Sequence, residues 1–325
     1  MKSSHYFSIL LVLFIGLCLL SLSWGRYPIT LSDVVQTLLG KPQTDIHCNI
    51  IFNLRLPRIL AAVLIGAALS IAGTTYQGIF RNPLVSPDIL GVSNGACVGA
   101  AVAILIGVDT LSVQVFAFIG GLFAVLIAMN LPRLIQCDSN IMLVLSGIIV
   151  SGFMMATLGL IKYLADPETQ LADIVYWQLG SLTKSNYANL APLSPIILFS
   201  ILTLFAMRWR INVLSLGERE AKLIGANIRF ERGVMVCTAT LLTVRRMFKR
   251  CYRLAGISYP PARLFIGDNN VKSLPIAALI GAIFLLIVDT LARNLYVQEI
   301  PLSILTGFIG APFFAWVLIK QNVTH

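Results

Sequence analysis

Arginine and aspartate side chains that interrupt apolar runs are the groups in this sequence with the clearest chemical potential. Arg55 and Arg58 lie one helical turn apart directly before an apolar run, and Asp289 precedes Arg293 by four positions inside another. Guanidinium groups bind carboxylates strongly where water is scarce. Arg55 and Arg58 could reach the membrane interface from the end of a helix. Asp289 is a functional candidate, and a structural pair with Arg293 is at least as good an interpretation.

Catalytic and metal-binding patterns are missing from the sequence. The three histidines, His5, His47 and His325, are widely scattered, and the six cysteines have no CxxC spacing. Zinc sites and disulfide frameworks need more closely patterned residues. The sequence also lacks GxxxxGK[ST], the loop that cradles nucleotide phosphates. We therefore expect no metal, no cofactor and no enzymatic activity in this chain, and any ATP to be used by another subunit.

The composition indicates a membrane protein. Of 325 residues, 57% are hydrophobic and 12% are charged, with a mean hydropathy of +0.85. Soluble domains carry about 25% charged residues. The net charge of +10 could indicate nucleic acid as a partner. However, the basic residues lie between apolar runs, which favours anchoring at the cytoplasmic face of a lipid membrane and no nucleic acid.

The apolar runs predict an all-α polytopic protein with about ten transmembrane helices. About 20 apolar residues suffice to cross the hydrocarbon core. Small residues such as Gly66 would let neighbouring helices approach closely. Residues 26–54 are predicted to be external with a short helix at 31–39, and residues 166–185 to form a polar loop. The predicted spans cover residues 6–22, 59–78, 93–108, 113–131, 141–164, 190–207, 274–295 and about 300–320, with a further span starting at 233–244.

Residues 55–99 carry a long motif, RLPRILAAVLIGAALSIAGTTYQGIFRNPLVSPDILGVSNGACVG. This run resembles the permease subunits of metal-chelate ABC importers of the FecCD type, and the resemblance continues in the segment around Asp289 and in 300–314. It implies a single transmembrane permease domain over residues 1–325 with the ABC type II importer permease fold. It also implies an ATP-binding subunit, a periplasmic substrate-binding protein and a second permease copy, giving a homodimer, as partners.

The resemblance also implies roles for particular residues. Arg55, Arg58 and Arg293 would dock the binding protein by receiving its acidic groups. The cytoplasmic coupling loop 208–232, with six Lys/Arg and three Glu, would dock on the ATPase. Residues 176–182, YWQLGSL, resemble the family's WxxGSL element, although a Trp and Tyr anchor at the membrane interface is an open alternative. The residues expected to couple to the ATPase are Leu216, Gly217, Glu218, Ala221, Leu223 and Gly225.

Polar residues in or beside a span usually face a cavity. Gln77, Asn82, Pro83 and Leu84 are therefore candidates for the translocation path. The Lys/Arg excess of 208–232 places that loop in the cytoplasm. Counting spans from it puts both termini in the cytoplasm of a bacterium, with the protein in the inner membrane and Arg55 and Arg58 outside.

Residues 244–261 break the pattern, because Arg245, Arg246, Lys249, Arg250 and Arg253 occupy positions where a helix should still cross the bilayer. Five central charges would cost ~12–17 kcal/mol on the insertion scale. Reading this stretch one nucleotide out of frame can restore the expected family motif. We interpret it as the product of two compensating frameshifts; a genuine basic loop that replaces one helical hairpin is the alternative.

The resulting functional prediction is a permease subunit of a binding-protein-dependent ABC importer for a metal chelate, foremost an iron-siderophore-type complex. A molybdate or tungstate importer of the same family is an alternative. An ion-coupled secondary transporter is another, although it would need buried carboxylates as coupling sites, and Asp289 is nearly alone in the predicted spans.

Overall fold

The computed structural model describes residues 2–82, 85–135, 140–183, 185–192, 194–244, 269–296 and 299–322. Within these ranges the chain is helical and has no β-strand, which confirms the predicted all-α class. A lipid environment favours this outcome, because a helix satisfies its backbone hydrogen bonds internally. Of the segment 244–261, all but Val244 lies outside the described residues, so the frameshift interpretation stays a prediction.

Long apolar helices stand where the sequence predicts spans. They are α1 (Lys2–Ser23), α4 (Leu56–Phe80), α5 (Val92–Ile106), α6 (Thr110–Leu134), α7 (Asn140–Leu164), α10 (Ser194–Ala206), α13 (Ile228–Val244), α15 (Asn270–Asn294) and α16 (Leu302–Asn322). Shorter helices connect them: α2 (Leu31–Leu38), α3 (Asp45–Cys48), the π-helix η1 (Asn49–Arg55), α8 (Gln170–Leu179), α9 (Tyr187–Leu190), α11 (Arg208–Leu216) and α12 (Glu218–Leu223).

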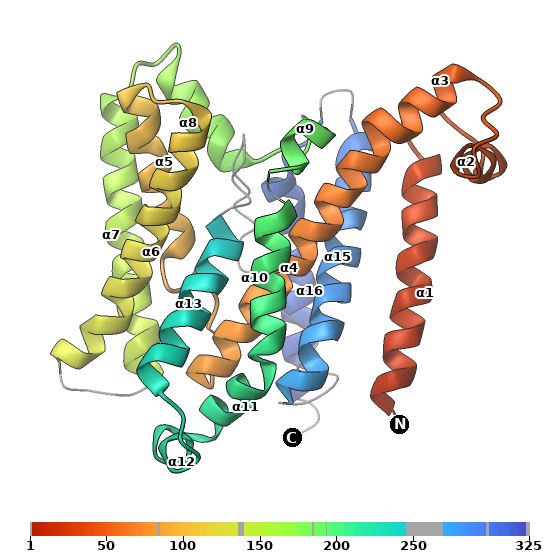
Figure 1. The fold of residues 1–325 in the computed structure, drawn as a ribbon. Helices are drawn as coiled ribbons and strands as arrows, with labels where there is room; N and C mark the ends of the chain where they lie inside the picture. The colour runs from red at the N-terminus through yellow and green to blue at the C-terminus, as the bar shows by residue number, and fades with distance from the viewer. Residues whose placement is uncertain are drawn as a thin grey trace.

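Helices α4 and α15 pack against each other at the centre of the bundle, and α1, α10, α11 and α13 pack around this pair. Helices α5, α6 and α7 form a group beside them, in contact with one another and with α13. Figure 1 shows α2, α3, α8 and α9 at one end of the bundle and α11 and α12 at the other, where α1 also begins. We call these the α2 end and the α12 end.

Five helical segments of the described chain are long and apolar enough to cross a membrane, or six if the bent pair α10 and α11 forms one span. Among the residues searched for spans, Val92–Ile106 and Leu302–Pro312 are apolar helices that are shorter than a complete span. For example, α5 has 15 residues, fewer than the ~20 of a complete span, and it lies between Gly91 and Gly107, which both have left-handed φ values. The short helix predicted at 31–39 is confirmed as α2, and its external position stays a prediction.

Two glycines allow α4 and α15 to touch through their backbones. A Cβ atom on Gly66 would collide with the carbonyl oxygen of Gly281, and a Cβ on Gly281 would collide with that of Gly66. No larger residue fits at this crossing without separating the helices. The predicted role of Gly66 in close helix packing is therefore confirmed, and α4 and α15 form one closely packed pair.

Two local predictions were wrong. Residues 166–185 are not a loop throughout, because α8 occupies the middle and buries Ile174 and Trp177 against the bundle. Trp177 is therefore a packing residue, whereas its neighbour Tyr176 is exposed. The span predicted to begin at residue 190 begins instead at Ser194, after α9 has ended. Pro192, which lacks an N–H and cannot continue a helix, lies in the break.

Candidate functional site

A buried ion pair joins α4 to α15 near the α2 end. The Nε atom of Arg58 donates to both carboxylate oxygens of Asp289, at 3.0 and 3.1 Å, and Nη2 lies 2.9 Å from Oδ1. Asp289 is fully buried and Arg58 nearly so. Such a two-pronged pair orients both side chains, and removing one partner would leave an uncompensated buried charge.

Arg293 contributes a second positive charge to Asp289. Its Nε atom lies 3.4 Å from Oδ2 of Asp289, as the four-residue spacing predicts. Its Nη2 atom donates to the hydroxyl of Ser21 on α1, which in turn shares a 2.9 Å hydrogen bond with Thr290. The structural pairing of Asp289 with Arg293 is confirmed, and the same arginine fastens α1 to α15.

Glu299, in the segment between α15 and α16, completes the cluster. Its Oε1 atom accepts a 2.8 Å hydrogen bond from Nη1 of Arg58, and its Oε2 atom accepts one of 2.8 Å from the hydroxyl of Thr183. Burial disfavours its charged form, but the hydrogen bond and charge of Arg58, with Thr183 and Arg26, hold the pKa of Glu299 below its ordinary value. We call Arg58, Asp289, Arg293 and Glu299 the ion cluster.

Arg55 has different partners from Arg58. Its guanidinium donates to the backbone carbonyls of Leu22, Ser23 and Tyr27, at or just after the end of α1. The last carbonyls of a helix have no partner within that helix, so a cation there is stabilising. Arg55 thus caps α1. Gly25 lies so close that a Cβ atom there would collide with this guanidinium.

The structure places the three predicted docking arginines at the same end of the bundle and gives each of them partners within the chain. Arg58 and Arg293 meet through Asp289, whereas Arg55 is held by carbonyl groups. Their binding to a separate protein stays a prediction. Sequence reasoning missed Glu299 and Thr183. The sequence does show a lone acidic residue, Glu299, six positions after Arg293, and this could have indicated a further partner for the arginines. No feature of the sequence singles out Thr183.

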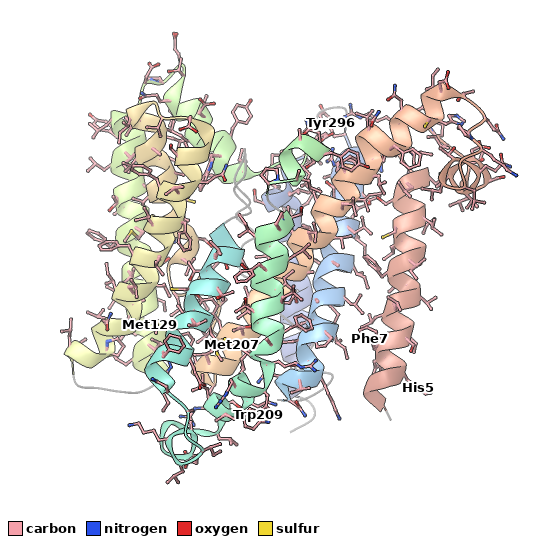
Figure 2. All side chains as sticks on the ribbon, viewed as in Figure 1. His5, Phe7, Met129, Met207, Trp209 and Tyr296 are labelled. Atoms are coloured by element: carbon pink, nitrogen blue, oxygen red, sulfur yellow. The ribbon has the colours of Figure 1, made fainter. Side chains whose placement is uncertain are left out.

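The α12 end carries an exposed apolar surface on short helices. Leu216 and Leu223 are 59% and 88% exposed, and Ile224 is also exposed, while Ala221 packs inward with none of its surface exposed. Gly217 separates α11 from α12 with a φ of 141°, and Gly225 follows α12 with a φ of 80°. These left-handed values favour glycine. Figure 2 shows Trp209 at this end of the bundle, on α11.

Two contacts fasten this surface to the central helix pair. Arg81, which ends α4 with a φ of 50°, donates to the carbonyl of Leu216 at 3.3 Å. Asn212 on α11 accepts hydrogen bonds from the backbone and side chain of Asn270, at 2.7 and 2.8 Å. Its amide donates to Asn269 at 3.1 Å. The short helices therefore connect to both α4 and α15.

The candidates for a translocation path lie at the α12 end of α4. Gln77 is buried and Asn82 is half-buried, and the carbonyl of Gln77 accepts the backbone N–H of Asn82 at 3.3 Å. Pro83 and Leu84 lie outside the described residues. The path stays a prediction. In the described part of the chain, no three His, Cys, Asp or Glu side chains are grouped to hold a metal ion.

Comparisons with known proteins identify the family. The model of the FecCD transport family matches residues 11–320. The molybdate import system permease protein MolB of Haemophilus influenzae is 34% identical over 96% of this chain and 94% of its own length. A probable iron chelatin transport system permease protein of Helicobacter pylori is 38% identical over 84% of this chain and 83% of its own.

A solved structure shares the architecture. It is described as an inward-facing conformation of a metal-chelate type ABC transporter, with a TM-score of 0.81, 34% identity and coverage of 97% of this chain and 98% of that one. The helical bundle and these matches define a multi-pass membrane permease. The chain belongs to the FecCD transport family.

Proposed function

We propose that this chain is the permease subunit of a binding-protein-dependent ABC importer that carries a metal chelate, foremost an iron-siderophore-type complex, across a bacterial inner membrane. Two copies would line the path, and separate ATP-binding subunits would drive transport. The family match over residues 11–320 carries the proposal. The names of two relatives state different substrates, molybdate and iron chelatin. The family match therefore supports a permease but does not choose between these substrates.

The α12 end supports docking of the ATPase. Leu216, Leu223 and Ile224 expose apolar side chains among charged residues, and helices in such a position can insert into a partner's groove. Their links to α4 through Arg81 and to α15 through Asn212 would pass a rigid-body movement into the bundle. In this orientation the α12 end faces the cytoplasm, the start of α1 lies on the same side, and the ion cluster lies outside.

An ion-coupled secondary transporter is not favoured. Such a transporter needs an acidic group that gains and loses a proton or cation during the cycle. Asp289 is fully buried and held in ion pairs by both Arg58 and Arg293, so its carboxylate is committed to the packing of α4 against α15 and is not open to a coupling ion. ATP-dependent transport within the family is the better account.

Reconstitution tests the proposal. The permease would be co-expressed with the ATP-binding subunit encoded beside it, both as written and with residues 244–261 restored to the alternative frame. Co-purification and ATP-dependent uptake of ferric siderophore, haem, cobalamin or molybdate into proteoliposomes would then be measured with the neighbouring binding protein. Uptake of a ferric siderophore supports the full proposal, and uptake of molybdate alone would replace its substrate. No association with the ATPase in either form would contradict it.

A further inference from the structure

Glu299 is the most accessible member of the ion cluster. Its side chain is 24% exposed, compared with 9% for Arg58, 10% for Arg293 and none for Asp289. The cluster pairs two arginines with two carboxylates, so its formal charge is zero while Glu299 is ionised. A carboxylate approaching from outside would therefore meet another carboxylate before it met the guanidinium of Arg58.

We propose that Glu299 is an exchangeable counter-ion of Arg58, which an acidic side chain of the docking binding protein displaces. This inference rests on the proposed function, because it supplies the partner. A nearly buried guanidinium is costly to leave unpaired. Glu299 keeps Arg58 neutralised in the free permease, and the arriving carboxylate neutralises it in the complex. Docking thus exchanges one charge-assisted hydrogen bond for another.

The two carboxylates bound to Arg58 are not equally replaceable. Asp289 sits within the rigid α15, is fully buried and contacts both arginines. Glu299 lies between helices, and it contacts Arg58 through Oε1 while Thr183 donates to its other oxygen. Displacing Glu299 requires the loss of two hydrogen bonds at a partly exposed position. Displacing Asp289 would require opening the α4–α15 contact.

Exchange would also alter how the helices are joined. The segment after α8 holds the start of α16: the carbonyl of Gly180 accepts the N–H of Leu302 at 3.3 Å, and that of Leu179 accepts the hydroxyl of Ser303 at 2.8 Å. The hydrogen bond from Arg58 to Glu299 connects α4 to this junction. Release of Glu299 removes this ion pair between α4 and the α8–α16 junction, while the Arg58–Asp289 pair and the apolar packing of Ala61 with Leu302 in one core cluster stay intact. Partner docking is thereby coupled to the packing of α4.

A first experiment examines the free permease. Glu299→Gln removes the charge and retains an oxygen that can accept from Arg58 or Thr183. Glu168→Gln is the matched control, because Glu168 is an exposed glutamate just before α8 at the same end. Arginine-selective labelling with phenylglyoxal, read by peptide mass spectrometry, should modify Arg58 faster in Glu299→Gln than in either the wild type or Glu168→Gln. Equal labelling would overturn the counter-ion assignment.

A second experiment examines docking to the permease–ATPase complex in nanodiscs, with the neighbouring binding protein as the probe. Glu299→Gln should tighten binding about three- to tenfold, because the Glu299 carboxylate no longer competes with the arriving one for Arg58. Thr183→Val, which removes one hydrogen bond from Glu299, should shift binding in the same direction by less. Glu168→Gln should leave it unchanged.

Unchanged or weaker binding in Glu299→Gln would overturn the exchange. If the wild-type complex binds no binding protein, both the exchange and the binding-protein part of the proposed function fail. The labelling experiment still reports separately whether Glu299 shields Arg58. The two failures are therefore distinguishable.

Discussion

Arg58 and Asp289 are separated by 231 positions in the sequence and meet in a two-pronged ion pair inside the bundle. Both belong to the central helix pair, and both lie in an environment that excludes most water. The pair therefore fixes the register of α4 against α15 near the α2 end. The backbone contact of Gly66 with Gly281 fixes the same helices deeper in the bundle.

Replacing one member of the ion pair should destabilise the permease strongly. Asp289→Asn leaves Arg58 and Arg293 without their shared carboxylate, and breaking a buried pair costs ~3–5 kcal/mol. Thermal unfolding in detergent should show a lower midpoint than in Glu168→Gln. The double variant Asp289→Leu with Arg293→Leu should lose less than Asp289→Asn, because Arg58 keeps Glu299 as its counter-ion and no buried charge is left unpaired. An equal or greater loss in the double variant would contradict this account.

A larger side chain at the contact between α4 and α15 should destabilise the folded protein. Gly66→Leu would force the two backbones apart, and overpacking of a close contact costs ~1–3 kcal/mol. The matched control is Gly152→Leu on α7, because a Cβ atom at Gly152 meets nothing within 4 Å. The yield of folded protein and its thermal midpoint should fall only for Gly66→Leu. Similar losses in the two variants would show that bulk alone is responsible.

A charge on the exposed surface of α12 should disturb docking without disturbing folding. Leu223 is 88% exposed, so Leu223→Glu removes no packing inside the chain. If this surface binds the ATPase, burying the new charge weakens association by about tenfold or more. Co-purification would be compared with Leu39→Glu, an exposed leucine near α2. Retained co-purification in Leu223→Glu would exclude this side chain from the interface.

The link between α11 and α15 should contribute measurable stability. Asn212→Ala removes the acceptor for both donors of Asn270, and an unsatisfied buried polar group costs ~1–3 kcal/mol. Asn53→Ala is the control, because Asn53 is exposed and its amide bonds Asn49 within η1. Hydrogen exchange at the start of α15 should accelerate only in Asn212→Ala. Unchanged exchange there would show that α15 begins independently of α11.

Acid should weaken the contribution of Glu299. Arg58 and Arg26 and the hydrogen bond from Thr183 lower its pKa in the folded protein, against the effect of burial. Its stabilising contribution is therefore fully present above the pKa of the unfolded chain, about 4.3, and is lost as the pH falls through the lower folded value. The other charges beside Glu299 are Asp289, which also pairs with Arg58, and Arg293, which pairs with Asp289. Between pH 6 and pH 3, unfolding midpoints of wild type and Glu299→Gln should converge; parallel curves would contradict the assignment.

The sequence by itself determined the helical class, most span positions and the pairing of Asp289 with Arg293. These are local properties: apolar run length sets a membrane helix, and a four-residue spacing puts two side chains on one helix face. It also indicated which segments were polar enough for docking. It did not reveal α8, because the interior surface that accepts Ile174 and Trp177 comes from other helices.

Only the tertiary structure decided the partners of Arg55 and Arg58. Arg55 and Arg58 lie three positions apart in the sequence, yet one caps α1 and the other binds α15 and Glu299. Their difference arises from which distant segment packs beside each guanidinium. A buried charge needs charged or hydrogen-bonding partners wherever it falls, and Arg58 receives its counter-ions from positions more than two hundred residues away.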